Sequence, residues 1–298
     1  MEGKLVKTQK LSLASKAKGY LLVTKPPSVL LLVFTAVGGM IAAVGPAIPW
    51  GKFLIAFVAI TAGCAGANTI TSYIDRDIDA VMERTRRRPL PQGIISPEEA
   101  LMWGIILSTG AILLSALLNW WALFWMLFGL FDNIVVYSLL SKRRTPWNII
   151  LGSFSGGAPT VFGWAAMRGD IALLPVLMAA LVVLWTPAHI WSLALRYRDD
   201  YARAGVPMLP VVTSEKKVLR CVVSTALLMF IVSVLIQAVG GFGPIYSFLA
   251  YIPGVALLMV NFYLWFKPTA RNAWIAFKIT SPYLAALFTG VILESILG

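Results

Sequence analysis

Two stretches of the chain gather acidic, basic and hydroxyl side chains of the kinds that hold a metal ion together with a polyanion. The first stretch contains Asn68, Thr71, Ser72, Asp75, Asp77 and Asp79, and then Glu83, Arg84, Arg86, Arg87 and Arg88. The second contains His189, Ser192, Arg196, Tyr197, Arg198, Asp199, Asp200, Tyr201 and Arg203. Together they hold five of the seven aspartates in the chain. Hard divalent cations bind carboxylate oxygens, so both stretches are candidate metal and anion sites.

The spacing of the first stretch places polar side chains on one face of a helix. At 100° per residue, the pattern i, i+4, i+7, i+11 connects Asn68, Ser72, Asp75 and Asp79. Asp77 points the opposite way if the helix continues that far. Two carboxylates one turn apart repel each other, and Mg²⁺ resolves this by binding one or two carboxylates together with substrate phosphates. The arginines that follow offer positive charge to a polyanion.

The second stretch has a similar arrangement, because the pattern i, i+3, i+7, i+11 connects His189, Ser192, Arg196 and Asp200. Such a face predicts a polar floor for an anionic substrate. Three plainer interpretations stay open. Charges at helix ends are often only solvated, neighbouring aspartates can pair with arginines and bind no metal, and His189 can have a purely structural role.

The composition shows which kind of element must position these side chains. The chain has 298 residues, of which 59% are hydrophobic and 13% are charged, and its mean hydropathy is +0.81. Soluble domains carry about 25% charged residues, so the chain is an integral membrane protein. Disorder, a coiled coil and a disulfide scaffold are excluded, and Cys64 and Cys221 both lie in apolar runs. The net charge of +12 reflects basic loops on one side of a bilayer and not nucleic-acid binding.

The length of the apolar runs predicts an all-α fold of nine transmembrane helices. A bilayer core of about 30 Å needs roughly 20 apolar residues per helix, whereas a β-barrel would show short alternating strands. The windows fall near 21–44, 53–74, 99–118, 120–140, 148–167, 171–195, 218–239, 244–266 and 274–296. The links are short, so we expect a single membrane-embedded domain over 1–298, with a basic cytoplasmic segment at 1–18.

Charge predicts the orientation of the nine spans. Only Lys52 and Arg168 fall in links on the side opposite the N-terminus, so 23 of the 25 lysines and arginines (25 − 2) lie on or border the other side. The positive-inside rule then places the N-terminus in the cytoplasm and the C-terminus outside. The first apolar run is long and lacks a cleavage site, so it is a retained span. With no organelle-targeting segment evident, we expect a prokaryotic cytoplasmic membrane. Asp132, near the middle of the fourth span, needs a partner or a wet cavity.

Several short motifs resemble one family of membrane enzymes. They are 73–79 (YIDRDID), 82–86 (MERTR), 88–91 (RPLP), 142–145 (KRRT), 156–159 (GGAP) and 201–211 (YARAGVPMLPV). These motifs resemble the UbiA-type intramembrane prenyltransferases, and among them the heme O synthases (protoheme IX farnesyltransferases). The resemblance runs from the first span to the last. The aspartate-rich motif alone specifies only the superfamily.

The resemblance implies a nine-helix fold around a central cavity open to the cytoplasm. It implies Mg²⁺-assisted transfer of a farnesyl group from farnesyl diphosphate to the vinyl group of heme b, with water completing the new side chain. Heme A synthase or a terminal oxidase assembly is the expected protein partner. The catalytic residues would be Asp75, Asp79, Asp199, Asp200 and Arg196, and the four aspartates would bind the metal. The expected substrate-binding residues are Asn68, Thr71, Arg84, Arg88, Lys142, Arg143, His189, Tyr197, Arg198 and Tyr201.

The chain departs from the superfamily pattern at two places. The residue four before Asp75 is Thr71 where the family commonly has asparagine, and Asn68 one turn earlier can substitute for it. The second motif lacks an aspartate four residues beyond Asp199 or Asp200, so arginines of that motif could bind the diphosphate directly. Other functions stay open: a UbiA-type enzyme with an aromatic acid, chlorin or glycerol lipid as acceptor, a cation-coupled transporter, or a structural assembly protein.

Overall fold

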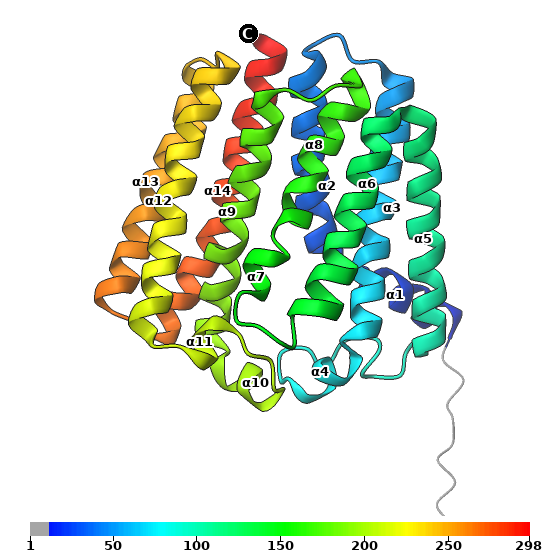
Figure 1. Ribbon diagram of the computed structural model, residues 1–298, viewed down its shortest axis with the longest axis vertical. Coiled ribbons are helices and arrows are strands. Elements are labelled where there is room, and N and C mark those ends of the chain that lie inside the picture. Colours follow the sequence, from blue (N-terminus) through cyan, green and yellow to red (C-terminus); the bar gives the residue numbers. More distant parts are fainter. Residues whose placement is uncertain (1–11) are drawn as a thin grey trace, which may run out of the picture.

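The computed structural model describes residues 12–298, and every regular element in that range is a helix (Figure 1). The elements are α1 (Leu13–Val23), α2 (Pro26–Val44), α3 (Trp50–Ile74), α4 (Arg76–Val81), α5 (Pro97–Leu118), α6 (Trp120–Phe131), η1 (Asp132–Ser141, a π-helix), α7 (Asn148–Leu151), α8 (Phe154–Arg168), α9 (Leu173–Arg196), α10 (Arg198–Arg203), α11 (Leu209–Val212), α12 (Glu215–Gly240), α13 (Pro244–Phe266) and α14 (Ala270–Leu297).

The prediction of an all-α fold with nine membrane spans is confirmed for the described residues. The spans are Pro26–Val44, Trp50–Ile74, Pro97–Leu118, Trp120–Ser141, Asn148–Arg168, Leu173–Arg196, Glu215–Gly240, Pro244–Phe266 and Ala270–Leu297. Proline in the first turn starts several of them, because its missing N–H has no partner there anyway. Ser96 and Glu99 add a reciprocal capping box at the start of α5.

The first span begins later than its apolar run. The run starts at residue 21, but α1 ends at Val23 and α2 starts at Pro26. Lys25 lies between the two helices with a φ of 57°, a left-handed conformation, and the chain changes direction there. The predicted start at 21 was therefore wrong, because hydropathy does not reveal this turn. Of the basic segment expected at 1–18, residues 1–11 lie outside the described residues.

The fourth and fifth spans are not regular α-helices. The fourth changes to a π-helix at Asp132, and the fifth is interrupted at Gly152 and Ser153 between α7 and α8. The Asp132 carboxylate accepts a hydrogen bond of 2.7 Å from the backbone N–H of Ser155, in the first turn of α8. This bond supplies the partner that a buried carboxylate in a membrane span requires. It satisfies one of the free N–H groups at the helix start.

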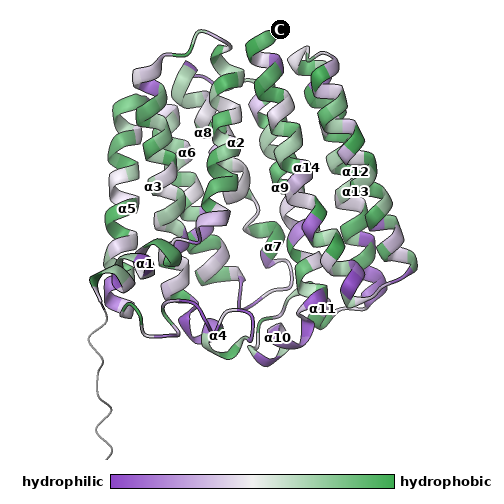
Figure 2. Ribbon diagram, turned by 180° about the vertical axis from the view of Figure 1, so that it is seen from behind, coloured by the Kyte–Doolittle hydropathy of each residue, from purple (hydrophilic) through white to green (hydrophobic). Residues whose placement is uncertain are grey.

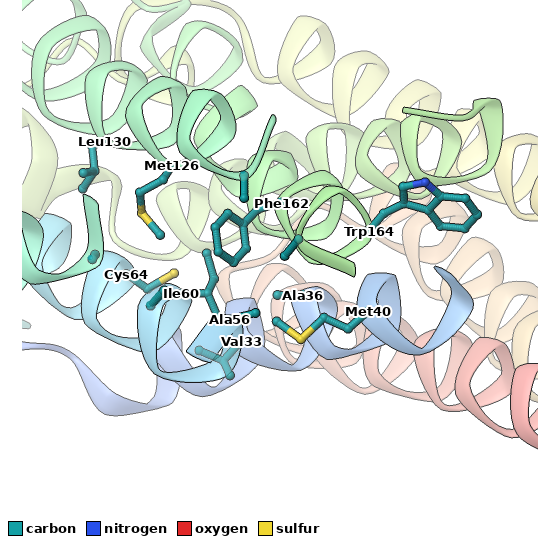
Figure 3. Packing of buried hydrophobic residues seen from close by; sticks show 14 of the residues in the cluster. Val33, Ala36, Met40, Ala56, Ile60, Cys64, Met126, Leu130, Phe162 and Trp164 are labelled. Carbon is teal, nitrogen blue, oxygen red and sulfur yellow. The ribbon is translucent and has the colours of Figure 1, made fainter. Parts of the chain in front are cut away.

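The spans pack into a closed bundle in which α14 contacts α2 and α8 contacts both α2 and α9 (Figure 1). Part of the core lies between α2, α3, α6 and α8, where Met40, Ile60, Met126 and Phe162 interdigitate (Figure 3). Large apolar side chains such as Phe248 remain exposed on the outer surface, as a lipid-facing surface requires. The apolar residues cover the bundle sides in Figure 2.

Hydrophilic residues gather at the end of the bundle that carries α4, α10 and α11, and the C-terminus lies at the opposite end (Figures 1 and 2). We call the end with α4, α10 and α11 the polar end. Both motifs singled out in the sequence lie there. The predicted opening of a central cavity to the cytoplasm and the predicted orientation in the membrane stay predictions.

Candidate active site

The polar end brings the two motifs into direct contact. In each motif a long span is followed by a helix of six residues, α4 after α3 and α10 after α9. The Asp200 carboxylate on α10 accepts hydrogen bonds from the backbone N–H groups of Glu83 and Arg84, at 3.3 and 3.2 Å. The loop after α4 is therefore tied to α10.

The assumption of one continuous helix through each motif was wrong. Asp75, with φ −91° and ψ 6°, separates α3 from α4, and Tyr197, with φ −112° and ψ 31°, separates α9 from α10. At the edge of the apolar layer water can satisfy backbone groups, so the helix no longer has to continue. Asp75 and Asp79 are nevertheless both buried, whereas Asp77 is exposed, in agreement with the opposite directions predicted for them.

Asp75 lies buried against the end of the fourth span. Its carboxylate forms an ion pair with Lys142, the first residue after η1. Burial alone would lower the pKa of Lys142, but the Tyr137 phenol and the Asp75 carboxylate outweigh burial and raise this pKa above its usual range. The other carboxylate oxygen, Asp75 Oδ1, is buried and has no hydrogen-bond partner within residues 12–298. An unpaired buried acceptor is costly, so this oxygen is ready to accept a cation.

Asp79 is held by the arginine that closes the first motif. Arg88 Nη1 donates to both carboxylate oxygens of Asp79, at 3.0 and 2.7 Å. A small pocket of about 210 Å³ adjoins this pair, lined by Leu22, Val23, Lys25, Ser72, Asp79, Arg88, Pro89 and Leu90. Asp79 and Arg88 are thus both positioned to exchange their mutual contact for contact with a ligand.

Lys25 is a site residue that the sequence analysis missed. Its ammonium lies 3.5 Å from the Thr71 hydroxyl. Burial, together with the nearby positive charges of Arg88 and Lys142, lowers the pKa of Lys25 to about 7 against the opposing effect of the two buried aspartates. The available signal was an isolated lysine directly before a Pro-Pro pair at the start of an apolar run.

Asp77 and Arg143 form an ion pair on the outer side of the site. Their two hydrogen bonds measure 2.7 and 2.6 Å, and Arg143 also donates to the Ile74 carbonyl oxygen at 2.9 Å. The hydrogen bonds from Arg143 lower the pKa of Asp77 to about 2. This pair connects the residues that follow η1 to α4. The role expected for Arg143 in diphosphate binding stays a prediction.

The aspartates of the second motif have different surroundings. Asp200 is buried, pairs with Arg203, and caps the backbone N–H groups of the α4 loop. Burial opposes its ionisation, but the hydrogen bonds from Arg203 and from the backbone of Arg84 and Glu83 outweigh burial and lower the pKa of Asp200. Asp199 is exposed. Asp200 therefore holds the two motifs together in this state of the protein.

The aromatic and basic residues of the second motif surround the α4 loop. The Arg84 guanidinium lies 3.5 Å from the Tyr201 hydroxyl and 5.9 Å from the centre of the Tyr197 ring. Arg196 and Arg198 are exposed. These arginines are available to an anion that approaches the polar end from water.

An inner pocket lies inside the bundle between α2, α3, α6, η1 and α8. Its walls are Leu32, Ile60, Gly63, Cys64, Ala67, Asn68, Trp125, Met126, Gly129, Leu130, Asn133, Ser155, Ala158 and Pro159. Asn68 Nδ2 and Asn133 Oδ1 are buried atoms without a hydrogen-bond partner in the described chain. Asn68 precedes Asp75 by two helical turns, and from Asn68 to Ile60 the wall rises about 12 Å along α3. The pocket is lined mostly by apolar side chains, and its polar members are Asn68, Asn133 and Ser155.

His189 lies away from the acidic residues, between α9 and α14. Its ring is stacked between Trp185, at 4.3 Å between ring centres, and Phe277, at 4.2 Å. Its Nδ1 contacts the Thr280 hydroxyl at 2.6 Å. Ser192, on the same helix, is buried and donates to a backbone carbonyl of its own helix. The predicted continuous face from His189 to Asp200 thus divides into two separate environments.

The carboxylates of the site suit a divalent cation whose remaining ligands come from a substrate. Within residues 12–298, no three histidine, cysteine, aspartate or glutamate side chains are grouped so that they could share one metal ion. Asp75 and Asp79 provide two carboxylates, and Asp75 Oδ1 lacks a partner. Mg²⁺ is commonly held by one or two carboxylates and by substrate phosphates. The site therefore fits Mg²⁺ that arrives with a phosphorylated ligand better than a permanent metal cage.

The fold and the site can now be compared with known proteins. A model of the UbiA prenyltransferase family matches residues 31–286. The chain therefore belongs to the UbiA prenyltransferase family, as its motifs indicated.

Similar proteins agree with this assignment. The protoheme IX farnesyltransferase of Desulforudis audaxviator is 49% identical over 283 residues, which cover 93% of this chain and 88% of that protein. The protein of the same name from Thermoplasma volcanium is 42% identical, and the match covers 94% of this chain and 99% of that protein. A solved UbiA homologue from Aeropyrum pernix K1 has a TM-score of 0.74 at 20% identity, and the match covers 90% of this chain and 98% of that one. Another from Archaeoglobus fulgidus, bound to GPP and Mg²⁺, has a TM-score of 0.64 at 16% identity, covering 92% and 99%.

Proposed function

We propose that this protein transfers a farnesyl group from farnesyl diphosphate to the vinyl group of heme b and so produces heme O. Relatives named protoheme IX farnesyltransferase match more than nine tenths of the chain. The observation that carries the proposal at the site is the buried pair of Asp75 and Asp79, each held by a base. An apolar pocket reaches Asn68, two turns before Asp75 on the same helix. This arrangement matches a diphosphate joined to an isoprenoid chain.

The charges of the site suit a diphosphate. Three bases (Lys25, Arg88 and Lys142) surround two carboxylates (Asp75 and Asp79). With Lys25 protonated the net charge of this group is +1 (3 − 2), so an anion is attracted to it. Asp75 and Asp79 would hold Mg²⁺, which when bound supplies the positive charge that neutralises a leaving diphosphate.

The bases act as the bond between the farnesyl carbon and the diphosphate oxygen breaks. Released from their carboxylate partners, Arg88 and Lys142 donate hydrogen bonds to the phosphate oxygens and stabilise the developing negative charge. Arg84, Arg143, Arg196 and Arg198, with the hydroxyls of Tyr197 and Tyr201, line the approach. Asp199 and Asp200 would complete the metal site if α10 moves when substrate binds.

The inner pocket is the proposed site for the isoprenoid tail. Its walls are apolar except for Asn68, Asn133 and Ser155. The farnesyl carbon that loses the diphosphate forms its new bond to the terminal vinyl carbon of heme b. Water adds to the other vinyl carbon and releases a proton, which gives a hydroxyethylfarnesyl group. These steps need no strongly basic catalyst, which agrees with a chain that has a single histidine.

We place the enzyme in the cytoplasmic membrane of a prokaryote, with the polar end in the cytoplasm. The distribution of lysine and arginine supports this orientation, and it gives the site direct access to water-soluble diphosphates. Heme A synthase or a terminal oxidase assembly would receive the product.

The test compares three asparagine variants of the purified protein. Asp75→Asn and Asp79→Asn should each reduce farnesyl transfer by about 100-fold or more, because they remove charge that acts on the leaving group. Asp77→Asn is the matched control, since Asp77 is exposed on the same segment, and it should keep most of the activity. The assay is the mass of farnesylated heme after incubation with heme b, farnesyl diphosphate and Mg²⁺.

Three outcomes would contradict the proposal. Full activity of either buried variant in saturating Mg²⁺ would show that the metal site is wrong. Transfer to 4-hydroxybenzoate but not to heme b would show a different acceptor. Cation flux in liposomes without prenyl transfer would indicate a transporter.

A further inference from the structure

His189 is the only histidine in the chain, and the structure holds its ring rigidly. Trp185 and Phe277 stack on its two faces. The Trp185 indole N–H donates to the Thr280 carbonyl oxygen at 3.0 Å, which fixes Trp185 against α14. The imidazole therefore has one orientation, set by neighbours on two different spans.

The hydrogen bonds around Thr280 determine which nitrogen of His189 carries the proton. The Thr280 hydroxyl donates its single hydrogen to the Phe277 carbonyl oxygen at 2.7 Å. It can therefore only accept from His189 Nδ1, which lies 2.6 Å away. Nδ1 is thus the protonated nitrogen of a neutral ring, and the lone pair that can bind a metal lies on Nε2.

Nε2 is left available by the surrounding protein. Across residues 12–298 it has no hydrogen-bond partner, and it is not among the unpartnered atoms that the protein fully encloses. A histidine with a purely structural role would normally satisfy both nitrogens. The stacking rings also exclude water from its faces, which favours a ligand that brings its own metal.

We infer that His189 Nε2 is an axial ligand to the iron of the heme acceptor, an inference that rests on the proposed function. Neutral imidazole is a common ligand of heme iron. The bond from Nδ1–H to Thr280 is the kind of outer contact that orients a ligating histidine and raises its basicity. Trp185 and Phe277 offer apolar surface to the macrocycle.

The position of His189 also agrees with the reaction. It precedes Arg196 at the end of α9 by seven residues, or about 10 Å of helix. Iron lies at the centre of the macrocycle, and the vinyl groups lie at its rim. A ligand set back from the polar end therefore holds the iron inside the bundle and leaves a vinyl group nearer the diphosphate.

The experiment uses full-length protein with a tag that contains no histidine, so that any histidine ligation must come from His189. Ferric heme b is added, and its absorption and electron paramagnetic resonance spectra are recorded for wild type and His189→Ala. Wild type should give a histidine-ligated spectrum, which His189→Ala loses and added imidazole restores. Heme affinity should fall at least tenfold in His189→Ala, whereas the affinity for metal-free protoporphyrin IX should not change.

Thr280→Val is a second variant that keeps the histidine and removes its orienting acceptor. It should weaken heme binding by about 10–100-fold and again leave metal-free protoporphyrin unaffected. An unchanged heme spectrum in His189→Ala, or an equal loss of both porphyrins, would overturn the inference. Farnesyl transfer by wild type, measured in parallel, keeps the two ideas separate. If wild type farnesylates heme b while the spectra do not depend on His189, only the ligand assignment fails, whereas a wild type that neither binds nor modifies heme b defeats both.

Discussion

Each buried aspartate at the polar end has a basic partner, and Lys25 is the additional base beside these pairs. Asp75 pairs with Lys142 and Asp79 with Arg88, so binding of an anion requires an exchange of partners. Within residues 12–298 Lys25 forms no ion pair with a carboxylate, and its pKa of about 7 puts its charge change in the physiological range. The charge state of Lys25 should therefore control how well the empty site attracts a diphosphate.

Diphosphate affinity should fall as the pH rises above 7. In the ligand-free protein Lys25 loses its proton near this pH, because its pKa is lowered. A bound diphosphate favours the ammonium form, so binding above pH 7 takes up a proton. The Lys25 contribution to affinity then decreases by up to about tenfold per pH unit, which is ~1.4 kcal/mol. The measurement is the Kd of a non-reactive farnesyl diphosphate analogue between pH 6 and 9.

Lys25→Arg is the control for this pH dependence. Arginine keeps its charge over the whole range, so the variant should show only the titration of the ligand itself. The ratio of the two affinities isolates Lys25. Parallel profiles for wild type and Lys25→Arg would show that Lys25 does not titrate in the site.

Substitution of Asp200 should destabilise the protein much more than substitution of Asp199. Asp200→Asn removes the charge that pairs with Arg203 and caps the α4 loop, and charged hydrogen bonds contribute about 1.5–3 kcal/mol each. The exposed Asp199→Asn should change the free energy of unfolding by less than about 0.5 kcal/mol. Because the pKa of Asp200 is lowered, its contribution is present at neutral pH and is lost as the pH falls through that pKa. Thermal unfolding in detergent at pH 7 and at acidic pH measures both effects.

The Mg²⁺ requirement of the same variants tests the metal assignment. If Asp199 binds the ion in the working enzyme, Asp199→Asn will need more Mg²⁺ for half-maximal activity even though its stability is unchanged. If neither variant alters that requirement, the metal is held by the first motif alone.

The sequence analysis named Asp75, Asp79, Arg88 and Lys142, which the structure joins in two ion pairs, and it missed Lys25. The spacing of Asp75, Asp77 and Asp79 was sufficient to separate buried from exposed carboxylates. The choice of Arg88 over the adjacent arginines depends on the course of the loop after α4, which has no periodicity to read. The position of Lys25 in the site depends on its left-handed conformation between two helices. A hydropathy window averages over that turn and cannot detect it.

At the scale of the elements, α2 and α8 approach each other closely where they cross. A Cβ atom on Gly39 would lie 2.2 Å from the Thr160 carbonyl oxygen, and one on Gly163 would lie 2.1 Å from the Ala36 carbonyl oxygen. Backbone atoms cannot move aside as a flexible side chain can. The two glycines therefore let these spans approach each other directly, as small residues do in membrane helix pairs.

Gly39→Ala and Gly163→Ala should each destabilise the protein by about 1–3 kcal/mol or more through overpacking. Gly110→Ala is the matched control in α5, because no atom lies within 4 Å of the position of its added Cβ. Replacing a helical glycine there should be neutral or stabilise by up to ~1 kcal/mol. Unfolding midpoints in one detergent compare the three variants, and equal losses in all three would contradict the close crossing.

The lengths of the apolar runs predicted the nine spans, but they did not predict where the helices are interrupted. The π-helix from Asp132 is linked to the start of α8 by two hydrogen bonds to Ser155, whose N–H donates to Asp132 and whose hydroxyl accepts from Asn133. Such contacts join spans that are adjacent in space, so a hydropathy window within one span cannot detect them. The charge of Asp132 was the visible sign that this span is irregular.

At the scale of the whole molecule, the odd number of spans between α1 and the C-terminus puts these two parts of the described chain at opposite ends of the bundle. The polar end carries almost all of the basic links, since only Lys52 and Arg168 fall in links at the other end. Basic residues are retained in the cytoplasm during insertion. The proposed reaction requires this same orientation, because a diphosphate must reach the polar end from the cytosol.

A C-terminal fusion at Gly298 to alkaline phosphatase should therefore be active in a bacterial host, and the same fusion to green fluorescent protein should be dark. Fusions truncated at Lys216, at the polar end after the sixth span, should give the opposite pair of results. The reverse pattern would place Asp75, Asp79 and their bases outside the cell, away from cytosolic prenyl diphosphates, and would remove the physical basis for the proposed reaction. Phosphatase activity at both positions would instead show that the number of spans after Lys216 is even, against the three that the structure contains.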